Sequence, residues 1–177
     1  MSPKIASIAV IGKQNFNLYV RVFSKKETDL TYHFMIHTAC DELEAAQAKY
    51  ALEDNSQSQA QLALEMNPAS KQNDRSQENA GSNDRFSDMY LGLLHSRETA
   101  AVYGSMTNTQ IKFIVVLDDS EMIITDADMK SVFKAIHSAY ILHVCNPFYA
   151  FDDKTPIQSR KFDKMIEQIV ESWAPGG

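Results

Sequence analysis

The sequence predicts a three-layer α/β sandwich of the α+β type: a five-stranded, mainly antiparallel sheet with one helix on one face and two helices on the other. The predicted elements follow the order strand-strand-helix-strand-strand-strand-helix-helix. Two strand candidates, 5–11 and 110–117, are apolar on both alternating faces, which is typical of central strands covered on both sides. Each helical segment carries an apolar stripe that suits packing on such a sheet. At 177 residues the chain is long enough for one domain with an ordinary core.

The amino-terminal segment predicts a β-hairpin. The apolar run Ile5–Ile11 comes first, and the turn-forming residues Gly12-Lys13-Gln14-Asn15 follow it. From Leu18 to Phe23, aliphatic residues alternate with aromatic and charged ones. This alternation favours a half-buried second strand.

A helix is predicted to follow the hairpin. Asp29 is placed to cap its amino-terminal end, and a cluster of alanines near residue 46 favours helix. Residues of the core stripe recur at helical spacing: Ile36, Cys40, Leu43, Gln47 and Tyr50. The pattern fades near residues 50–52, where we predict that the helix ends.

Residues 53–84 differ in composition from the rest of the chain. Asn, Gln and Ser supply five residues each, so 15 of these 32 positions, and six acids against two bases give this segment a charge of −4. Such a segment cannot bury enough apolar surface to offset the entropy lost on ordering. We therefore predict one domain spanning 1–177, with a disordered, acidic, low-complexity insert at 53–84.

Three further strands are predicted after the insert, at 89–95, 100–106 and 110–117. The last of them contains the most β-branched run of the chain, Ile111–Leu117. This run suits the second central strand of the sheet.

Two helices are predicted to complete the chain. Thr125 is placed to cap the first, with Asp126 and Asp128 favourably located in its first turn. Asn146-Pro147 ends this helix, because the residue before a proline is pushed out of the helical region. The second helix carries a clear amphipathic stripe over 162–173.

The tetrapeptide Asn146, Pro147, Phe148 and Tyr149 joins these two helices. Proline stiffens the connection, and we predict a structural joint in which Phe148 and Tyr149 pack inward and fix the angle between the helices. The alternative is that the same four residues form an exposed peptide ligand.

Composition argues against several classes of function. The net charge of −6 and the lack of a basic patch argue against a nucleic-acid partner. No apolar run approaches the roughly 18 residues of a membrane span, so membrane association is expected only through other proteins. Cys40 and Cys145 lie inside apolar periodic segments and are predicted to be buried thiols rather than a disulfide.

No catalytic, cofactor or metal site is predicted. His33 and His37 are four residues apart, a spacing that suits two ligands of one metal ion, and Asp41 continues the same face. On a straight helix, however, Asp41 lies roughly 12 Å along the axis from His33, so the three side chains cannot share one ion. Gly92 and Gly104 are isolated, and neither lies in a phosphate-binding loop.

Asp41 lies at the edge of the predicted core stripe of the first helix. We hypothesise that this edge, together with Tyr32 and His33, contributes to a surface that contacts a partner. The alternative is that Asp41 belongs to the solvated face of an ordinary amphipathic helix.

Five separated blocks of the sequence carry a resemblance to a known family. The blocks are His33–Asp41 (HFMIHTACD), Tyr90–Leu94 (YLGLL), Val102–Thr109 (VYGSMTNT), Asn146–Tyr149 (NPFY) and Ile157–Asp163 (IQSRKFD). In this order they are similar to the sedlin family, and the likeness covers most of the chain outside 53–84.

The resemblance implies a longin/SNARE-like fold and a non-enzymatic adaptor role without a cofactor. Sedlin-like proteins are small subunits of the trafficking protein particle (TRAPP) complex, a vesicle tether and Rab nucleotide-exchange factor of ER-to-Golgi and Golgi transport. The implied partners are other small TRAPP subunits and a large subunit, with a Rab GTPase contacted indirectly. The implied location is the cytoplasm, at the periphery of ER and Golgi membranes through the complex. Alternatives are another longin-type trafficking module, such as a coat small chain, or a small enzyme on this scaffold.

Overall fold

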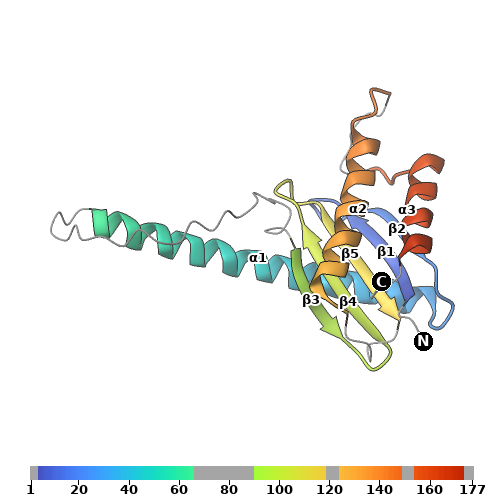
Figure 1. The fold of residues 1–177 in the computed structure, drawn as a ribbon, viewed down its shortest axis with the longest axis horizontal. Helices are drawn as coiled ribbons and strands as arrows, with labels where there is room; N and C mark the ends of the chain where they lie inside the picture. Colours follow the sequence, from blue (N-terminus) through green and yellow to red (C-terminus); the bar gives the residue numbers. More distant parts are fainter. Residues whose placement is uncertain (1–3, 66–89, 119–123, 149–153, 174–177) are drawn as a thin grey trace.

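The structure is a computed structural model that describes residues 4–65, 90–118, 124–148 and 154–173 (Figure 1). The predicted element order is confirmed. The strands are β1 (Lys4–Ile11), β2 (Asn17–Val22), β3 (Tyr90–Ser96), β4 (Ala100–Met106) and β5 (Lys112–Asp118). The helices are α1 (Asp29–Glu65), α2 (Asp126–Val144) and α3 (Arg160–Ser172).

The five strands form one fully antiparallel sheet in the order β2-β1-β5-β4-β3. β1 and β5 pair with each other, and each also pairs with a second strand, β2 and β4 respectively. The predicted central strands are therefore confirmed. Their register pairs Ile8 with Val115 and Ile5 with Leu117. All of β5, and all of β1 beyond Lys4, is buried. This burial explains why neither sequence alternates between apolar and polar residues.

Helices cover both faces of the sheet, as predicted (Figure 1). On one face α1 packs over a cluster that includes Ala9, Ile114 and Val116. On the other face α2 and α3 pack over a cluster that includes Val10, Phe113 and Val115. Alternate residues of the same strand thus pack into two separate cores, because successive side chains of a β-strand point to opposite faces of the sheet.

Side-chain caps set the starts of the helices. Thr125 Oγ1 accepts a hydrogen bond from the Asp128 amide at 3.3 Å, so the predicted cap of α2 is confirmed. At α3, Ser159 Oγ accepts from the Phe162 amide at 3.3 Å. At α1 the prediction was one residue late: Thr28 Oγ1 accepts from the Thr31 amide, while Asp29 is already helical. Asp29 lies instead in the first turn of α1, where its negative charge interacts favourably with the positive end of the helix dipole.

Helix α1 is longer than the sequence pattern predicted. It continues to Glu65 instead of ending near 50–52, and Figure 1 shows it running past the edge of the sheet. Residues 51–65 contain no Gly or Pro and are rich in Ala, Leu, Gln and Glu, which all favour helix. The disorder predicted for 53–65 is therefore corrected to helix, and residues 66–84 of the predicted insert lie outside the described residues. The single-domain organisation stays a prediction.

A buried lysine links three parts of the fold. Lys112 of β5 is buried, and its Nζ donates to Glu44 Oε1 of α1 at 2.6 Å and also to Asn15 Oδ1. Asn15 lies in the β1–β2 turn with a positive φ of 61°, a conformation that asparagine tolerates. Lys112 therefore ties α1 to the centre of the sheet and to the hairpin turn.

Replacing Glu44 by glutamine should destabilise the fold in a pH-dependent way. The hydrogen bond from Lys112 lowers the pKa of Glu44 below its ordinary 4.5. The stability that this pair contributes is complete above that ordinary pKa and is lost as the pH falls through the lowered one. Glu44 is half exposed, so we expect a loss of about 1–2 kcal/mol, below that of a fully buried pair.

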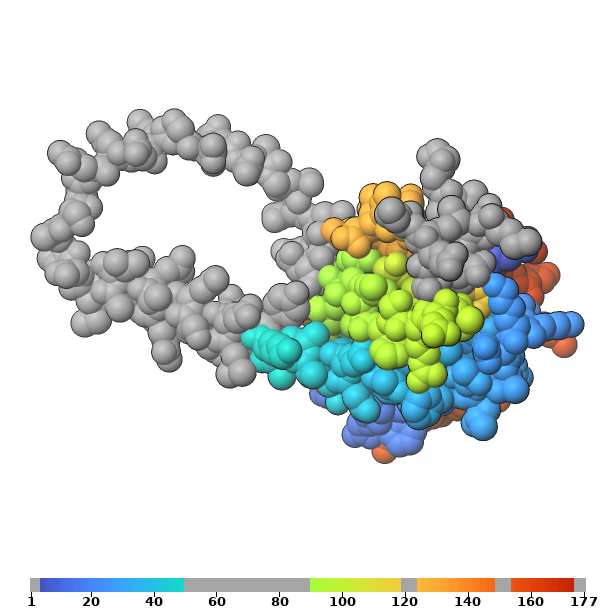
Figure 2. Space-filling view, turned by 90° about the horizontal axis from the view of Figure 1, so that it is seen from below, coloured from blue at the N-terminus to red at the C-terminus, as the bar shows by residue number. Residues whose placement is uncertain are grey.

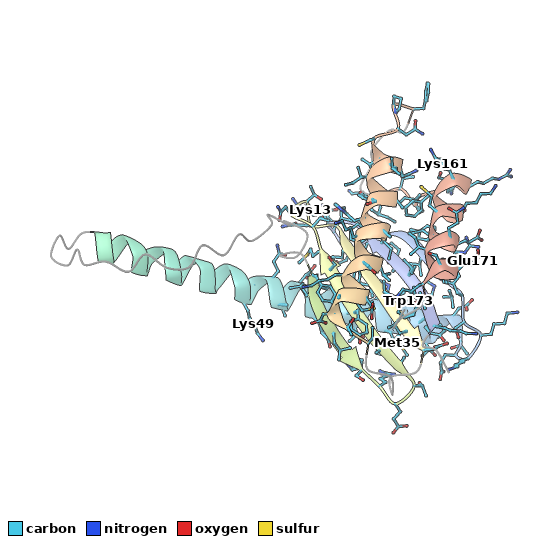
Figure 3. The ribbon with its side chains drawn as sticks, in the orientation of Figure 1. Lys13, Met35, Lys49, Lys161, Glu171 and Trp173 are labelled. Atoms are coloured by element: carbon cyan, nitrogen blue, oxygen red, sulfur yellow. The ribbon has the colours of Figure 1, made fainter. Side chains whose placement is uncertain are left out.

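Urea unfolding near neutral pH and at about pH 3.5 measures this effect. The difference between wild type and Glu44→Gln should shrink at the acidic pH, whereas Glu171→Gln, on the outer side of α3, should leave stability unchanged at both (Figure 3). An equal loss at both pH values would contradict the role of the ion pair.

Candidate interaction surface

The outward side of α1 carries exposed apolar side chains where an amphipathic helix usually carries polar ones. Leu30, Phe34, His37 and Asp41 follow each other at intervals of four, three and four residues, so they lie on one side of the helix. Leu30 is 78% exposed and Phe34 is 59% exposed. We name these four residues, together with the flanking His33, the α1 outer face.

The opposite side of α1 packs on the sheet. Its buried residues are Tyr32, Met35, Ile36, Ala39, Cys40 and Leu43. Their positions are rotated by about half a turn from the α1 outer face. One side of the helix is therefore committed to the core, and the other is available for contact.

Tyr32, predicted to lie at the partner surface, is buried in the core with no exposed area. Its Oη donates to Asp118 Oδ1 at 3.2 Å, and Ser24 Oγ donates to Asp118 Oδ2. Burial raises the pKa of Tyr32 and keeps it protonated as a donor. The prediction is corrected for this physical reason: Tyr32 fastens the start of α1 to the end of β5 and supports the surface from beneath.

The structure leaves His33 half buried and Asp41 exposed, both on the outward part of α1. Among the described residues, no three His, Cys, Asp or Glu side chains are grouped closely enough to hold a metal ion. In the same part of the chain, no helix is long and apolar enough to cross a membrane.

The β3–β4 turn extends the α1 outer face. The guanidinium of Arg97 lies 5.8 Å from the centre of the Phe34 ring, a cation–π distance. Arg97 Nε also donates to His95 Nε2 at 3.3 Å, and His95 Nδ1 lies 3.8 Å from Glu42 Oε1 on α1. In the space-filling view, α1 and the β3–β4 region form one continuous surface (Figure 2). This surface therefore combines apolar, acidic and basic groups.

The predicted inward packing at Asn146-Pro147-Phe148-Tyr149 is corrected for Phe148, and Tyr149 lies outside the described residues. Phe148 is 95% exposed, and its amide donates to Asn146 Oδ1 at 3.1 Å, which closes a tight turn after α2. Figure 1 shows the end of α2 extending beyond the sheet, so the described part of the chain offers Phe148 no core to enter. Cys145 is also exposed, contrary to its predicted burial, while Cys40 is buried as predicted.

Leu30, Phe34 and Arg97 were not among the predicted surface residues. Leu30 and Phe34 do leave a signal, since both are large apolar residues that fall outside the core stripe of their own helix. Arg97 leaves none, because only the folded β3–β4 turn brings it over Phe34.

The element order, the antiparallel sheet and the helices on both faces define a longin-like α+β module whose candidate site is a helix surface. The Sedlin family model matches residues 10–172, and the chain belongs to the sedlin family. The chain is similar to "Trafficking protein particle complex subunit 2-like protein" of Dictyostelium discoideum, with 34% identity over 96% of this chain and 98% of that protein. The proteins of the same name from Mus musculus and Xenopus tropicalis are 31% and 30% identical, each over 92% of this chain and 94% of the relative.

Proposed function

We propose that the protein is a non-enzymatic adaptor subunit of a TRAPP vesicle tether, and that the α1 outer face docks a neighbouring subunit. The names of its relatives support membership of a trafficking particle. The observation that carries the docking surface is the exposure of Leu30 and Phe34 on the same side of α1 as Asp41. Exposed apolar clusters rimmed by charges are typical of protein interfaces.

The finer role that we propose is in ER-to-Golgi and Golgi transport. The subunit would meet its Rab GTPase only indirectly, through the complex that exchanges its nucleotide. It would reach the cytoplasmic side of ER and Golgi membranes by the same route. The family membership supports this role.

Reversing the charge of Asp41 should weaken the docking without unfolding the protein. Asp41 is exposed, so Asp41→Lys should keep the wild-type melting temperature. A charge reversal at an interface costs association free energy, and we expect recovery of neighbouring TRAPP subunits to fall by about fivefold or more. Affinity purification of the full chain from cells, followed by quantitative mass spectrometry, measures this.

Glu171→Lys is the matched control, because it makes the same charge change on the outer side of α3 (Figure 3). It should leave recovery unchanged. Normal recovery with Asp41→Lys would refute the docking surface, whereas recovery of a coat complex by the wild type would refute TRAPP membership.

A further inference from the structure

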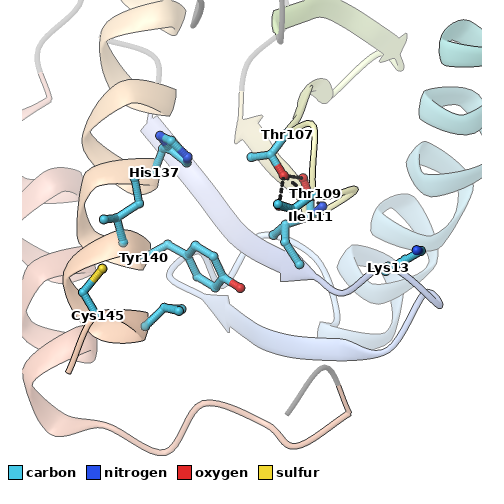
Figure 4. Close-up of a pocket in the computed structure, with 9 residues that line it drawn as sticks. Lys13, Thr107, Thr109, Ile111, His137, Tyr140 and Cys145 are labelled. Carbon is cyan, nitrogen blue, oxygen red and sulfur yellow. Dashed lines mark hydrogen bonds between the residues drawn. The ribbon is translucent and has the colours of Figure 1, made fainter. Parts of the chain in front are cut away.

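A cavity of about 580 Å³ opens at the carboxyl-terminal end of α2, on the face of the sheet opposite α1. Its walls come from three places: α2, the β1–β2 turn and the β4–β5 turn (Figure 4). Tyr140 projects from α2 toward the two turns (Figure 4), and Ile111, Ile141 and Val144 add apolar lining. The volume lies within the range of about 300–1,000 Å³ that is usual for binding cavities.

The walls of this cavity are held in place by the fold. Thr107 Oγ1 accepts from the Ile111 amide at 3.0 Å and lies 2.8 Å from Thr109 Oγ1, which fixes the β4–β5 turn. The rings of Tyr140 and His137 both lie edge-on to Phe113, with centroids 5.7 Å away. The cavity therefore exists before any partner arrives.

Exposed apolar side chains occur at the same end of α2. Ile141 lines the cavity and is 43% exposed, the adjacent Leu142 is 61% exposed, and Phe148 projects from the turn after α2. We name Ile141, Leu142 and Phe148 the α2-end patch. Three large apolar groups exposed within eight residues of chain are typical of a surface that contacts another protein.

The charges near this end of the molecule favour an acidic partner. Between Val144 and Asp163, every charged residue that the structure describes is basic: Lys154, Arg160 and Lys161. Asp152 and Asp153 lie outside the described residues. Lys13 lies on the wall of the cavity itself. Burial lowers the pKa of His137, so this imidazole is neutral near neutral pH. Lys13 is then the cationic side chain among the described lining residues.

We propose that this cavity receives an apolar side chain of an acidic amphipathic helix from a second partner subunit. The α2-end patch packs against the apolar side of that helix, and Lys13 faces its carboxylates. This rests on the proposed function only in that the protein works inside a complex. Because α1 and α2 cover opposite faces of the sheet, the contact is separate from the α1 outer face. The subunit can then hold two neighbours at once.

Cys145 gives a direct test, because it lines the cavity and is exposed. The chain has two cysteines, and Cys40 is buried with its pKa raised to about 11, so a maleimide reacts selectively with Cys145. In the complex purified from cells, we expect the maleimide to react with Cys145 about tenfold more slowly than in the isolated protein. A tenfold lower rate corresponds to about 1.4 kcal/mol of protection. An equal rate in the complex would overturn the proposal.

Two exposed substitutions test the chemistry of the partner. Leu142→Glu and Lys13→Glu should each lower recovery of the same one subunit by about fivefold. Recovery of that subunit with the Asp41→Lys variant should equal its recovery with the wild type. Leu93→Glu and Lys49→Glu are the matched controls, since they make the same changes on β3 and α1 and should not release it. Unchanged recovery with Lys13→Glu would overturn the acidic character of the partner.

The remaining outcomes are also decisive. Loss of the same subunit with Asp41→Lys and Leu142→Glu would overturn the claim of a second, separate contact. A wild-type chain that recovers no TRAPP subunit would refute the proposed function and this inference with it. Recovery of TRAPP subunits together with unprotected Cys145 would refute this inference alone.

Discussion

Replacing Phe162 by alanine should lower the free energy of unfolding by about 3–5 kcal/mol, the usual cost of removing a buried phenylalanine ring. Phe162 has no exposed area, and its ring meets Tyr19 of β2 edge-to-face with centroids 4.9 Å apart. The ion pairs of Arg21 with Asp163 and Glu167 also attach α3 to β2, but they are partly exposed and contribute little. Docking of α3 therefore depends mainly on this ring and on Ile166.

Urea unfolding followed by circular dichroism measures this loss. Phe148→Ala is the matched control: the same substitution at a ring that is 95% exposed should change stability by no more than about 0.5 kcal/mol. Similar stability of the two variants would contradict the packing of α3 described above.

Replacing Gly104 by alanine should cost about 1–3 kcal/mol, and by valine more, because there is no room for a side chain under α1. A Cβ at Gly104 would lie 2.5 Å from Leu94 Cδ1 and 2.8 Å from Leu43 Cδ2. Leu43 is a buried residue of α1, so either its packed side chain or the helix must shift to relieve the contact. We expect the larger valine to displace α1 and so to weaken docking at Asp41 as well, since the α1 outer face moves with the helix.

Thermal unfolding of Gly104→Ala, Gly104→Val and Gly92→Ala tests this account. Gly92 is the informative control because its φ is +80° while the nearest atom to its Cβ, on Tyr90, is 4.0 Å away. The cost of Gly92→Ala is backbone strain alone, about 1–2 kcal/mol. A Gly104 series that fails to worsen from alanine to valine would contradict the steric explanation.

Most of the fold could be predicted from the sequence because the spacing of apolar residues differs between helices, half-buried strands and fully buried strands. The runs 5–11 and 111–117 lack alternation, and the structure places them at the centre of the sheet with cores on both faces. The extent of α1 could not be read in this way. Beyond residue 52 the core stripe stops, but helix-forming residues continue, and backbone hydrogen bonds can extend a helix after packing has ended.

The candidate site was predicted less well than the fold, and the reasons are specific. Tyr32 finds its partner in Asp118, 86 positions away, so nothing local distinguishes it from a surface tyrosine. Phe148 was predicted to pack inward at the joint between α2 and α3, but its burial depends on how far α2 extends beyond the sheet. Asp41 was predicted at the edge of the core stripe, whereas the structure exposes it on the side of α1 opposite the buried residues.

The pairing of β1 with β5 has a consequence for how the chain folds. Ile5 pairs with Leu117, 112 positions later, so during synthesis β1 has an open, apolar edge until β5 has left the ribosome. The β3–β4–β5 meander can form from neighbouring residues, which makes closure of the β1–β5 ladder the late, slow step. The entropy of that closure grows only with the logarithm of the intervening length, by about 0.6 kcal/mol for each doubling. A change in the length of the α1–β3 connection should therefore alter the entropy of this closure only slightly.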